Sequence, residues 1–480
     1  MVFYLCLSQH FILLKGVIVS MKTLLRGGYV VSGKGCRRAD VLINGETVEK
    51  VGHVLPALAG DAQVVDVGGC YLFPGFIDAH THFDLDVCNT TTADDFESGS
   101  RSAIRGGTTT VIDFACPNKG ETLAYGLSLW HKKADGRCYC DYGFHMTIDD
   151  WNEDIEKELD DMFAEGITSF KMYLTYPAMM IGDGAVYHAL KALRRRGGIA
   201  GVHCENAGVI DARIEELKAE GCGADVSSHP IARPDYCEAE AVARLLRIAQ
   251  AAESPVVIVH TTNKAALGEI AAARRRGQKV YVETCPQYLA LDDSVYYDPD
   301  YSNAARFVCA PPIRTQEDSE ALWKALRRGE VQTISTDHCS FTLEQKDMGR
   351  EDFTKIPGGL PGVETRGEVI YTAGVAGKRM SLAGMCRALS ENPARLYGLF
   401  PRKGVLAEGS DADIVVYDPR ASHVLRAQDM VSKAGYTPFE GFRTEGSIVK
   451  VYLRGMLQVD GGKVVGGKHG VYLKRGKCEL

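Results

Sequence analysis

Two histidines at the end of an apolar stretch are the first residues whose type and spacing indicate chemistry. Residues 72–83, LFPGFIDAHTHF, begin as a strand buried on both faces would, and they contain His80 and His82. Residues i and i+2 of a strand point to the same side, so the two imidazoles are directed at one point, as metal ligands are. The alternative interpretation is two unrelated histidines near a strand end, because so short a motif often matches by chance.

Four more residues with metal-binding chemistry lie in or at the end of other apolar runs. They are Lys171 in the run 169–174, His203 at the end of 199–203, His260 at the end of 255–260 and Asp337 at the end of 332–337. Four histidines and one aspartate suit one or two divalent ions. Burial and nearby cations would lower the pKa of Lys171, and the neutral amine could then add carbon dioxide to become an anionic carbamate that bridges two ions. The alternative is that Lys171 extends its ammonium out into solvent.

The elements that must position these residues recur eight times. The apolar runs are 72–80, 108–114, 142–148, 169–174, 199–203, 255–260, 279–284 and 332–337. Segments such as 154–165 and 237–252, between the runs, carry apolar residues at helical spacing. This alternation predicts an α/β fold, a (β/α)8 TIM-like barrel with its active groups at the carboxyl ends of the strands. A doubly wound sheet is the second choice, because no Gly-x-Gly-x-x-Gly follows the first run.

Both ends of the chain show a different texture, with short β-like runs separated by glycines. We expect residues 21–71 and 401–465 to pair into one small β-sandwich domain, with the barrel over 72–400 and a tail over 466–480. Residues 1–20 lack a basic start and a continuous apolar core, since Lys15 and the polar residues 8–10 interrupt them. We interpret this segment as an upstream extension and Met21 as the natural start.

Composition excludes some classes of function. The 480 residues are 45% hydrophobic and 24% charged, an ordinary globular mixture. The net charge of −7 gives no electrostatic case for nucleic acid, and the arginine runs 194–196 and 274–276 are each followed by glycine, as at helix ends. An odd count of 15 cysteines without regular spacing indicates reduced thiols and a cytoplasmic protein.

The other histidines are assigned structural roles. His145 lies inside a run and is expected to be a hydrogen-bonded core residue, and His338 is expected to support the site without binding metal. The remaining histidines lie elsewhere and are expected to be structural or solvated: His10, His53, His131, His188, His229, His423 and His469.

From Met21 onward the chain resembles the cyclic amidohydrolases, most closely the dihydropyrimidinase and D-hydantoinase (phenylhydantoinase) family. The resemblance rests on six motifs, GFIDAHTH at 75–82, SFKMYLTY at 169–176, VETCPQY at 282–288, STDHC at 335–339, DFTKIP at 352–357 and GSDAD at 409–413. It implies metal-dependent hydrolysis of the cyclic amide bond of 5-substituted hydantoins or dihydropyrimidines to N-carbamoyl amino acids. It also implies a homotetramer, or a homodimer, with a small cyclic ureide as substrate and no nucleic-acid or membrane partner.

The resemblance further implies two Zn²⁺ ions per subunit, bridged by carboxylated Lys171 and a hydroxide. His80 and His82 with Asp337 would bind one ion, and His203 and His260 the other. Asp337 would also be the general base, and the hydroxyl of Tyr176 would stabilise the oxyanion.

In this family, backbone groups of two loops hold the substrate; here these loops are 309–312 and 357–360. The family pattern has serine and asparagine at the positions of Ala310 and Gly358, so the identity of the natural substrate is open. Loops 84–94 and 174–183 would form a lid over the substrate. The apolar residues of this lid, suited to a bulky ring substituent, are Leu85, Val87, Tyr173 and Met180.

Three other functions remain as alternatives. Dihydroorotase has arginine where this chain has Asp84, which would repel a substrate carboxylate. Allantoinase fits the segment 171–176 less well. A non-catalytic scaffold paralogue of the family would have lost metal ligands, which are all present here.

Overall fold

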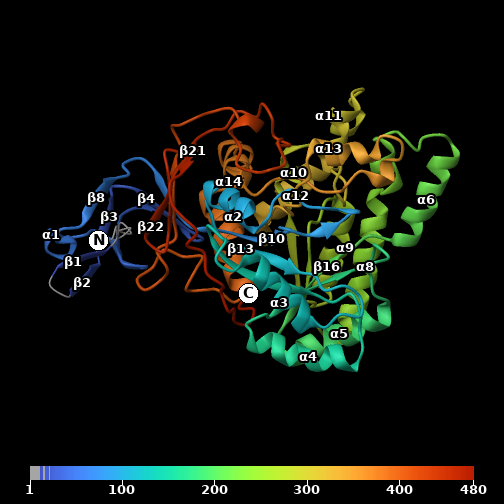
Figure 1. Ribbon diagram of the computed structural model, residues 1–480, viewed down its shortest axis with the longest axis horizontal. Helices are drawn as coiled ribbons and strands as arrows, with labels where there is room; N and C mark the ends of the chain where they lie inside the picture. The colour runs from blue at the N-terminus through green and yellow to red at the C-terminus, as the bar shows by residue number, and fades with distance from the viewer. Residues whose placement is uncertain (1–10, 15–16, 21) are drawn as a thin grey trace, which may run out of the picture.

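The computed structural model describes residues 11–14, 17–20 and 22–480 (Figure 1). Before the main body, β1 (Phe11–Leu14) and β2 (Val17–Ser20) pair antiparallel. The predicted start at Met21 and the rest of the predicted extension 1–20 lie outside the described residues.

Eight parallel strands form the centre of the molecule. They follow one another around the sheet in chain order: β10 (Phe76–Thr81), β13 (Thr108–Ala115), β14 (Asp141–Thr147), β15 (Ser169–Tyr173), β16 (Ile199–His203), β17 (Val256–Ile258), β18 (Val280–Thr284) and β19 (Thr333–Ile334). A parallel bridge between Thr81 and His338 joins the last strand region to the first. The predicted TIM-like barrel is therefore confirmed.

Helices follow the strands and cover the outside of the barrel (Figure 1). The longer ones are α2 (Phe96–Arg105), α3 (Leu123–Ala134), α4 (Glu153–Ala164), α5 (Asp183–Arg196), α6 (Ala207–Ala219), α8 (Asp235–Ala252), α9 (Lys264–Arg275) and α12 (Gln316–Arg328). The shorter ones are α7 (Ser228–Ala232), α10 (Pro286–Ala290), α11 (Tyr301–Ala305), α13 (Leu343–Lys346), α14 (Arg366–Ile370), α15 (Leu382–Cys386) and α16 (Asn392–Leu396). The arginine run 194–196 ends α5, and Gly197 adopts the left-handed conformation that caps it, as predicted.

The two ends of the chain combine into a second domain. One sheet has the order β23-β22-β21-β20-β9-β4-β5 and the other the order β7-β6-β3-β8. Their strands are β3 (Lys22–Arg26), β4 (Tyr29–Ser32), β5 (Gly35–Arg38), β6 (Asp40–Asn44), β7 (Thr47–Gly52), β8 (Gln63–Asp66), β9 (Tyr71–Pro74), β20 (Ile414–Asp418), β21 (Ser447–Leu453), β22 (Met456–Asp460) and β23 (Lys463–Val464), with the one-turn helix α1 (Pro56–Ala59) beside them. Buried residues of both sheets, including Leu25, Val41, Leu72 and Ile414, pack into one core. The expected β-sandwich built from both ends is confirmed.

The sandwich and the barrel meet at a break in the first predicted run. Residues 72–80 do not form one strand, because β9 pairs with β4 and β20 in the sandwich while β10 pairs with β13 in the barrel. The break lies at Gly75, where a Cβ atom would lie only 2.0 Å from the hydroxyl of Thr109. The chain therefore passes from one domain into the other within a single residue that has no room for a side chain.

A buried charge cluster also links the two domains. Lys403 donates to Asp141 at the start of β14 over 2.8 Å and to Asp413 beside β20 over 2.6 Å. Arg454, after β21, donates to the same Asp141 carboxylate. The barrel and the sandwich thus share paired charges that neither domain satisfies alone.

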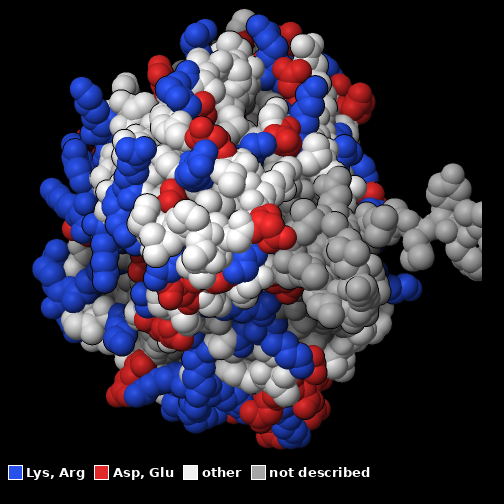
Figure 2. Space-filling model, turned by 90° about the vertical axis from the view of Figure 1, so that its left-hand side faces the viewer, with Lys and Arg blue, Asp and Glu red and all other residues white. Residues whose placement is uncertain are grey.

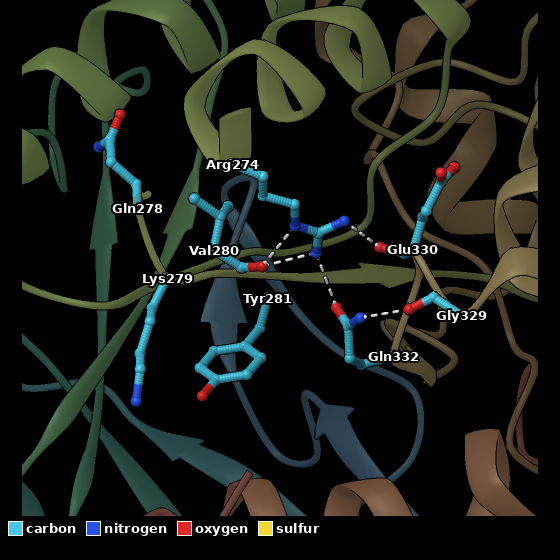
Figure 3. Close-up of a pocket in the computed structure, with 8 residues that line it drawn as sticks. All are labelled: Arg274, Gln278, Lys279, Val280, Tyr281, Gly329, Glu330 and Gln332. Atoms are coloured by element: carbon cyan, nitrogen blue, oxygen red, sulfur yellow. Dashed lines mark hydrogen bonds between the residues drawn. The ribbon is translucent and has the colours of Figure 1, made fainter. Parts of the chain in front are cut away.

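The C-terminal tail lies against the amino ends of the barrel strands, since Tyr472 bridges to Tyr142 near the start of β14 and Tyr281 near the start of β18 donates to the carbonyl of Leu480. A shallow cavity of about 400 Å³ surrounds Arg274 there (Figure 3). Its guanidinium donates to the carbonyls of Val280 over 3.0 Å and Glu330 over 2.7 Å and to the side chain of Gln332 over 3.0 Å. Arg274 is therefore occupied by its own chain, and its role here is structural.

The surface and the helices add two general facts. The face of the molecule in Figure 2 carries both basic and acidic side chains, with basic ones gathered along one edge. In the described part of the chain, none of the helices combines the length and the apolarity needed to cross a bilayer.

Candidate active site

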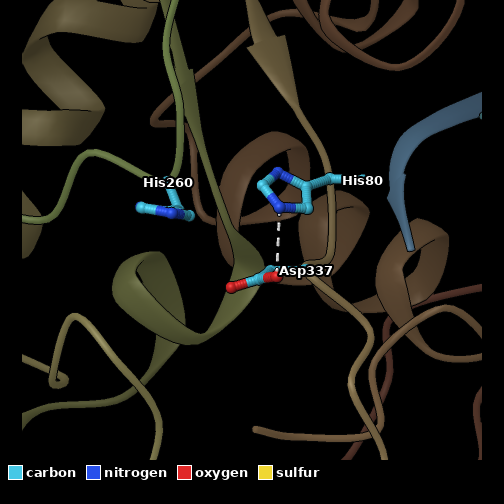
Figure 4. A group of neighbouring side chains, drawn as sticks. All are labelled: His80, His260 and Asp337. Carbon is cyan, nitrogen blue, oxygen red and sulfur yellow. Dashed lines mark ion pairs between the residues drawn. The ribbon is translucent and has the colours of Figure 1, made fainter. Parts of the chain in front are cut away.

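The six residues predicted as metal ligands lie together at the carboxyl ends of the barrel strands. His80 lies on β10, Lys171 on β15 and His203 on β16. His82, His260 and Asp337 follow strand ends, and all six line one cavity of about 410 Å³. Donor atoms of His80, His260 and Asp337 lie within 4.8 Å of one another (Figure 4). The structure thus brings together residues that are 257 positions apart in the sequence.

Backbone strain is concentrated at this site. His260 and Asp337 have φ angles of 36° and 54°, and Tyr176 on the cavity wall has φ 68°. Such left-handed conformations of residues other than glycine cost about 1–3 kcal/mol each and persist only where the surroundings impose them. Cys88, with φ 54°, also lines the cavity, and four such residues around one cavity are typical of a functional site.

Two buried glutamates orient the histidine rings. Glu283 lies 2.6 Å from Nδ1 of His80, which leaves Nε2 facing Asp337 at 3.2 Å. Glu205 lies 2.8 Å from Nε2 of His203, which leaves Nδ1 of that ring free for a ligand role. A carboxylate on one ring nitrogen fixes the tautomer and makes the other nitrogen a better metal ligand. Neither glutamate is predicted from the sequence, although each is an acidic residue near the end of a buried strand.

Lys171 is fully enclosed. Its Nζ lies 3.4 Å from Nε2 of His80. The ring centres of Phe114 and Tyr173 lie 5.0 and 5.1 Å from the same nitrogen. Burial lowers the pKa of this amine, which makes the neutral form that can take up carbon dioxide easier to reach. The side chain does not extend into solvent, since it is 1% exposed.

The donor set fits divalent metal ions. Asp337 contacts the imidazoles of His80 and His82 at 3.2 and 3.1 Å, and Nδ1 of His82 is buried without a hydrogen-bond partner. The histidines hold the pKa of the Asp337 carboxyl well below its usual value although burial acts to raise it. A carboxylate and convergent imidazoles are ligands that zinc and similar ions use, and a carbamate on the buried amine of Lys171 would add anionic oxygen ligands.

Tyr176 forms part of the cavity wall beside this centre. Its ring centre lies 5.1 Å from that of His203, and the guanidinium of Arg233 lies 5.6 Å from the ring. Arg233 also donates to Glu205 over 2.6 Å. Burial raises the pKa of Tyr176, so its hydroxyl stays protonated and can donate a hydrogen bond at neutral pH.

Most of the predicted substrate-facing residues line the cavity, but Met180 does not. Those lining it are Leu85, Val87, Tyr173, Tyr176, Ala310 and Gly358. Met180 is 38% exposed, and Met179 lines the cavity instead. The amides of both methionines donate to the carbonyl of Tyr176, and in such a helix-like turn neighbouring side chains point in different directions.

Two other predictions need correction. His229 was expected elsewhere in a structural or solvated role; it is buried and hydrogen-bonds the carbonyl of Cys309 over 2.8 Å, which is a structural role, but it also lines the cavity. Asp84 does not line the cavity and instead lies 3.9 Å from Arg137, so it does not face a substrate.

His145 and His338 are placed as predicted. His145 is buried between the hydroxyl of Ser169 at 2.6 Å and the carbonyl of Ala79 at 3.0 Å. His338 lies 3.1 Å from Asp94 and accepts a hydrogen bond from the amide of Gly362. Neither lines the cavity.

Comparison with known proteins identifies the family. The model of the amidohydrolase family matches residues 71–465, most of the chain. The chain belongs to this family. Among the relatives of this amidohydrolase, the D-hydantoinase of Streptomyces coelicolor is 40% identical over 470 residues, covering 96% of this chain and 99% of the relative. A D-phenylhydantoinase of Escherichia coli is 40% identical over 440 residues, covering 91% and 94%.

A solved structure supports the same placement. The crystal structure of the dihydropyrimidinase from Brevibacillus agri superposes on this amidohydrolase with a TM-score of 0.93 and 39% identity, covering 95% of this chain and 99% of the other. The barrel, the sandwich and their arrangement are therefore those of a known family of enzymes.

Proposed function

We propose that this amidohydrolase hydrolyses the cyclic amide bond of 5-substituted hydantoins or dihydropyrimidines and releases N-carbamoyl amino acids. The observation that carries the proposal is the convergence of four histidines, Asp337 and Lys171 on one cavity at the barrel mouth. It is supported by relatives named D-hydantoinase, D-phenylhydantoinase and dihydropyrimidinase that match nearly the whole chain.

The donor set leads us to propose two zinc ions per subunit. His80, His82 and Asp337 would hold one ion and His203 and His260 the other, with the carbamate of Lys171 shared between them. Bound zinc polarises a carbonyl oxygen and makes water acidic at neutral pH. The enclosed, depressed-pKa amine of Lys171 supports the carbamate, which would remove the unfavourable cation from this pocket.

The residues of the cavity would then transfer the proton, stabilise the developing negative charge and hold the ring. Asp337, ionised and facing the cavity, would take a proton from the attacking water and pass it to the departing ring nitrogen. Tyr176 would donate its hydroxyl proton in a hydrogen bond to the oxygen that becomes negative as the carbonyl is attacked. Backbone groups at Ala310 and Gly358 would hold the ring, whereas the serine and asparagine side chains of the family pattern are missing.

Hydrolysis of a small panel of substrates tests the proposed function. The panel is dihydrouracil, each enantiomer of 5-phenylhydantoin, allantoin and dihydroorotate. We expect kcat/KM for one phenylhydantoin enantiomer to be roughly tenfold above that for dihydrouracil, because the apolar lid makes favourable contacts with an aromatic substituent. Preferred turnover of allantoin or dihydroorotate would contradict the proposal.

Met179 and Met180 offer a matched test of the lid. We expect Met179→Ala to lower kcat/KM for 5-phenylhydantoin by roughly tenfold, because a side chain that lines the cavity loses its contacts with the substituent. Met180→Ala is the control and should leave the value unchanged, since Met180 is exposed. Steady-state kinetics measure kcat/KM for both variants. Equal losses of kcat/KM would contradict the placement of Met179, and not Met180, in the cavity wall.

The alternative functions are less well supported. Dihydroorotate carries a carboxylate, and the arginine of the cavity wall, Arg233, is already paired with Glu205 at 2.6 Å. A scaffold paralogue would hold less than one zinc per chain, which elemental analysis measures.

We propose that the protein is cytoplasmic, because the fourteen cysteines of its described residues are all free thiols. We also propose a homotetramer, which light scattering on the purified protein tests.

A further inference from the structure

Lys346 is a buried cation away from the candidate metal ligands. It ends α13 and is 1% exposed. Its Nζ lies 2.8 Å from the carbonyl oxygen of Val308, 2.6 Å from that of Pro357 and 2.8 Å from that of Gly359. An ammonium group has three N–H donors, and here each meets one carbonyl. Burial lowers the pKa of Lys346 to about 8, which leaves the group mostly charged at neutral pH.

The three carbonyls belong to the two loops that form one wall of the cavity. Val308 lies two residues before Ala310, and Pro357 and Gly359 flank Gly358. Ala310 and Gly358 both line the cavity. A Cβ atom built on Gly358 would lie 4.0 Å from the amide nitrogen of Ala310, so the two loops approach each other at this point.

The bonds of Lys346 fix the direction of backbone groups in both loops. A peptide unit is planar, so a bond to a carbonyl also orients the N–H of the next residue. The bonds to Val308 and Pro357 therefore orient the amides of Cys309 and Gly358. A backbone bond from Gly359 to the carbonyl of Val308, 3.0 Å long, joins the loops beside the ammonium.

We propose that Lys346 is a positioning residue for the substrate ring, holding the two loops whose backbone groups receive the cyclic ureide. The inference rests on the proposed function and adds a residue that does not touch the substrate, because Lys346 does not line the cavity. Loss of the ammonium leaves the buried carbonyls of Pro357 and Gly359 without a donor and that of Val308 with the amide of Gly359 alone, and it frees both loops to shift. Binding of the ring is weakened whatever its substituent, while the proton transfer at Asp337 is unaffected.

Two substitutions of Lys346, which remove different numbers of its N–H donors, test the proposal. Lys346→Met keeps the shape of the side chain without any donor, and Lys346→Gln keeps two N–H donors. We expect KM to rise about tenfold for the Met variant and less for the Gln variant, with kcat within about threefold of the parent enzyme. The factor should be the same for dihydrouracil and for 5-phenylhydantoin, because the ring and not the substituent is held. Lys355→Met, at an exposed lysine of the same segment, is the control.

Zinc content and thermal unfolding are measured on the same preparations. A purely structural role for Lys346 would lower the unfolding temperature and leave KM unchanged, and that result overturns the proposal. A KM that rises only for phenylhydantoin also overturns it. If the Met variant does not fold, the Gln variant carries the same comparison. A parent enzyme that hydrolyses no member of the panel would instead refute the proposed function, on which the inference depends.

Discussion

Asp337→Asn should lower kcat by about 10²–10⁴-fold, the usual contribution of a general base. The carboxylate faces the cavity from a strained backbone position and is held ionised by His80 and His82. An amide of the same shape cannot accept the proton of the attacking water. KM should change much less, because the loops at Ala310 and Gly358 hold the ring.

The comparison requires equal metal content. Both enzymes are loaded with zinc, the metal per chain is measured, and kcat is expressed per loaded site. Asp84→Asn is the control, because Asp84 precedes Leu85 of the cavity lining but does not itself line the cavity. A kcat within tenfold of the parent value at full occupancy would remove Asp337 from the role of base.

Lys171→Ala should abolish nearly all hydrolysis, with a loss of about 1,000-fold or more, since metal assistance contributes several kcal/mol to the barrier. The variant should also bind less zinc, because the shared anionic ligand is gone. The exposed Lys191 of α5, changed to Ala, should leave both quantities unchanged. Acetate at high concentration should restore part of the activity of Lys171→Ala, since a small carboxylate can take the place of the carbamate in the vacated space.

Formation of the carbamate on Lys171 leads to a separate prediction for the protein without substitutions. Metal-free protein prepared without carbon dioxide should regain activity with zinc slowly, and bicarbonate should accelerate the recovery. Reconstitution measured with and without bicarbonate checks this result. Equal rates and equal final activities in thoroughly degassed buffer would show that the free amine of Lys171 suffices.

The barrel and the positions of its six candidate ligands were predictable because both follow from local patterns. A parallel strand buried on both faces is apolar along its length, so the eight runs stand out, and their carboxyl ends must meet at one face of the barrel. The break between β9 and β10 was not predictable in this way, because Leu72 and Ile77 are equally apolar. The strand pairing in the structure shows that the two strands belong to different domains, since β9 pairs with β4 and β20 and β10 pairs with β13.

The supporting residues of the site were harder to predict, because their surroundings in the sequence are misleading. Lys346 lies in the strongly charged segment 344–351, EQKDMGRE, which by composition indicates a solvated loop. Its burial comes from two loops that fold against it, one 38 residues before it at Val308 and one 11–13 residues after it at Pro357 and Gly359. Glu205 and Glu283 are likewise acidic residues whose partners, His203 and His80, become visible only in three dimensions. Met179 lines the cavity in place of the predicted Met180 because of the conformation of the turn after Tyr176, which the sequence pattern does not reveal.

The buried cluster of Asp141 also has a consequence for how the protein is made. Its partners Lys403 and Arg454 lie 262 and 313 residues further along the chain. While the polypeptide is still emerging from the ribosome, the third barrel strand has a carboxylate that must stay hydrated, and the first half of the sandwich has no second half to pack against. The final structure can form only after almost the entire chain has been released, so the newly synthesised protein depends on remaining soluble, alone or with a chaperone, until its last strands arrive.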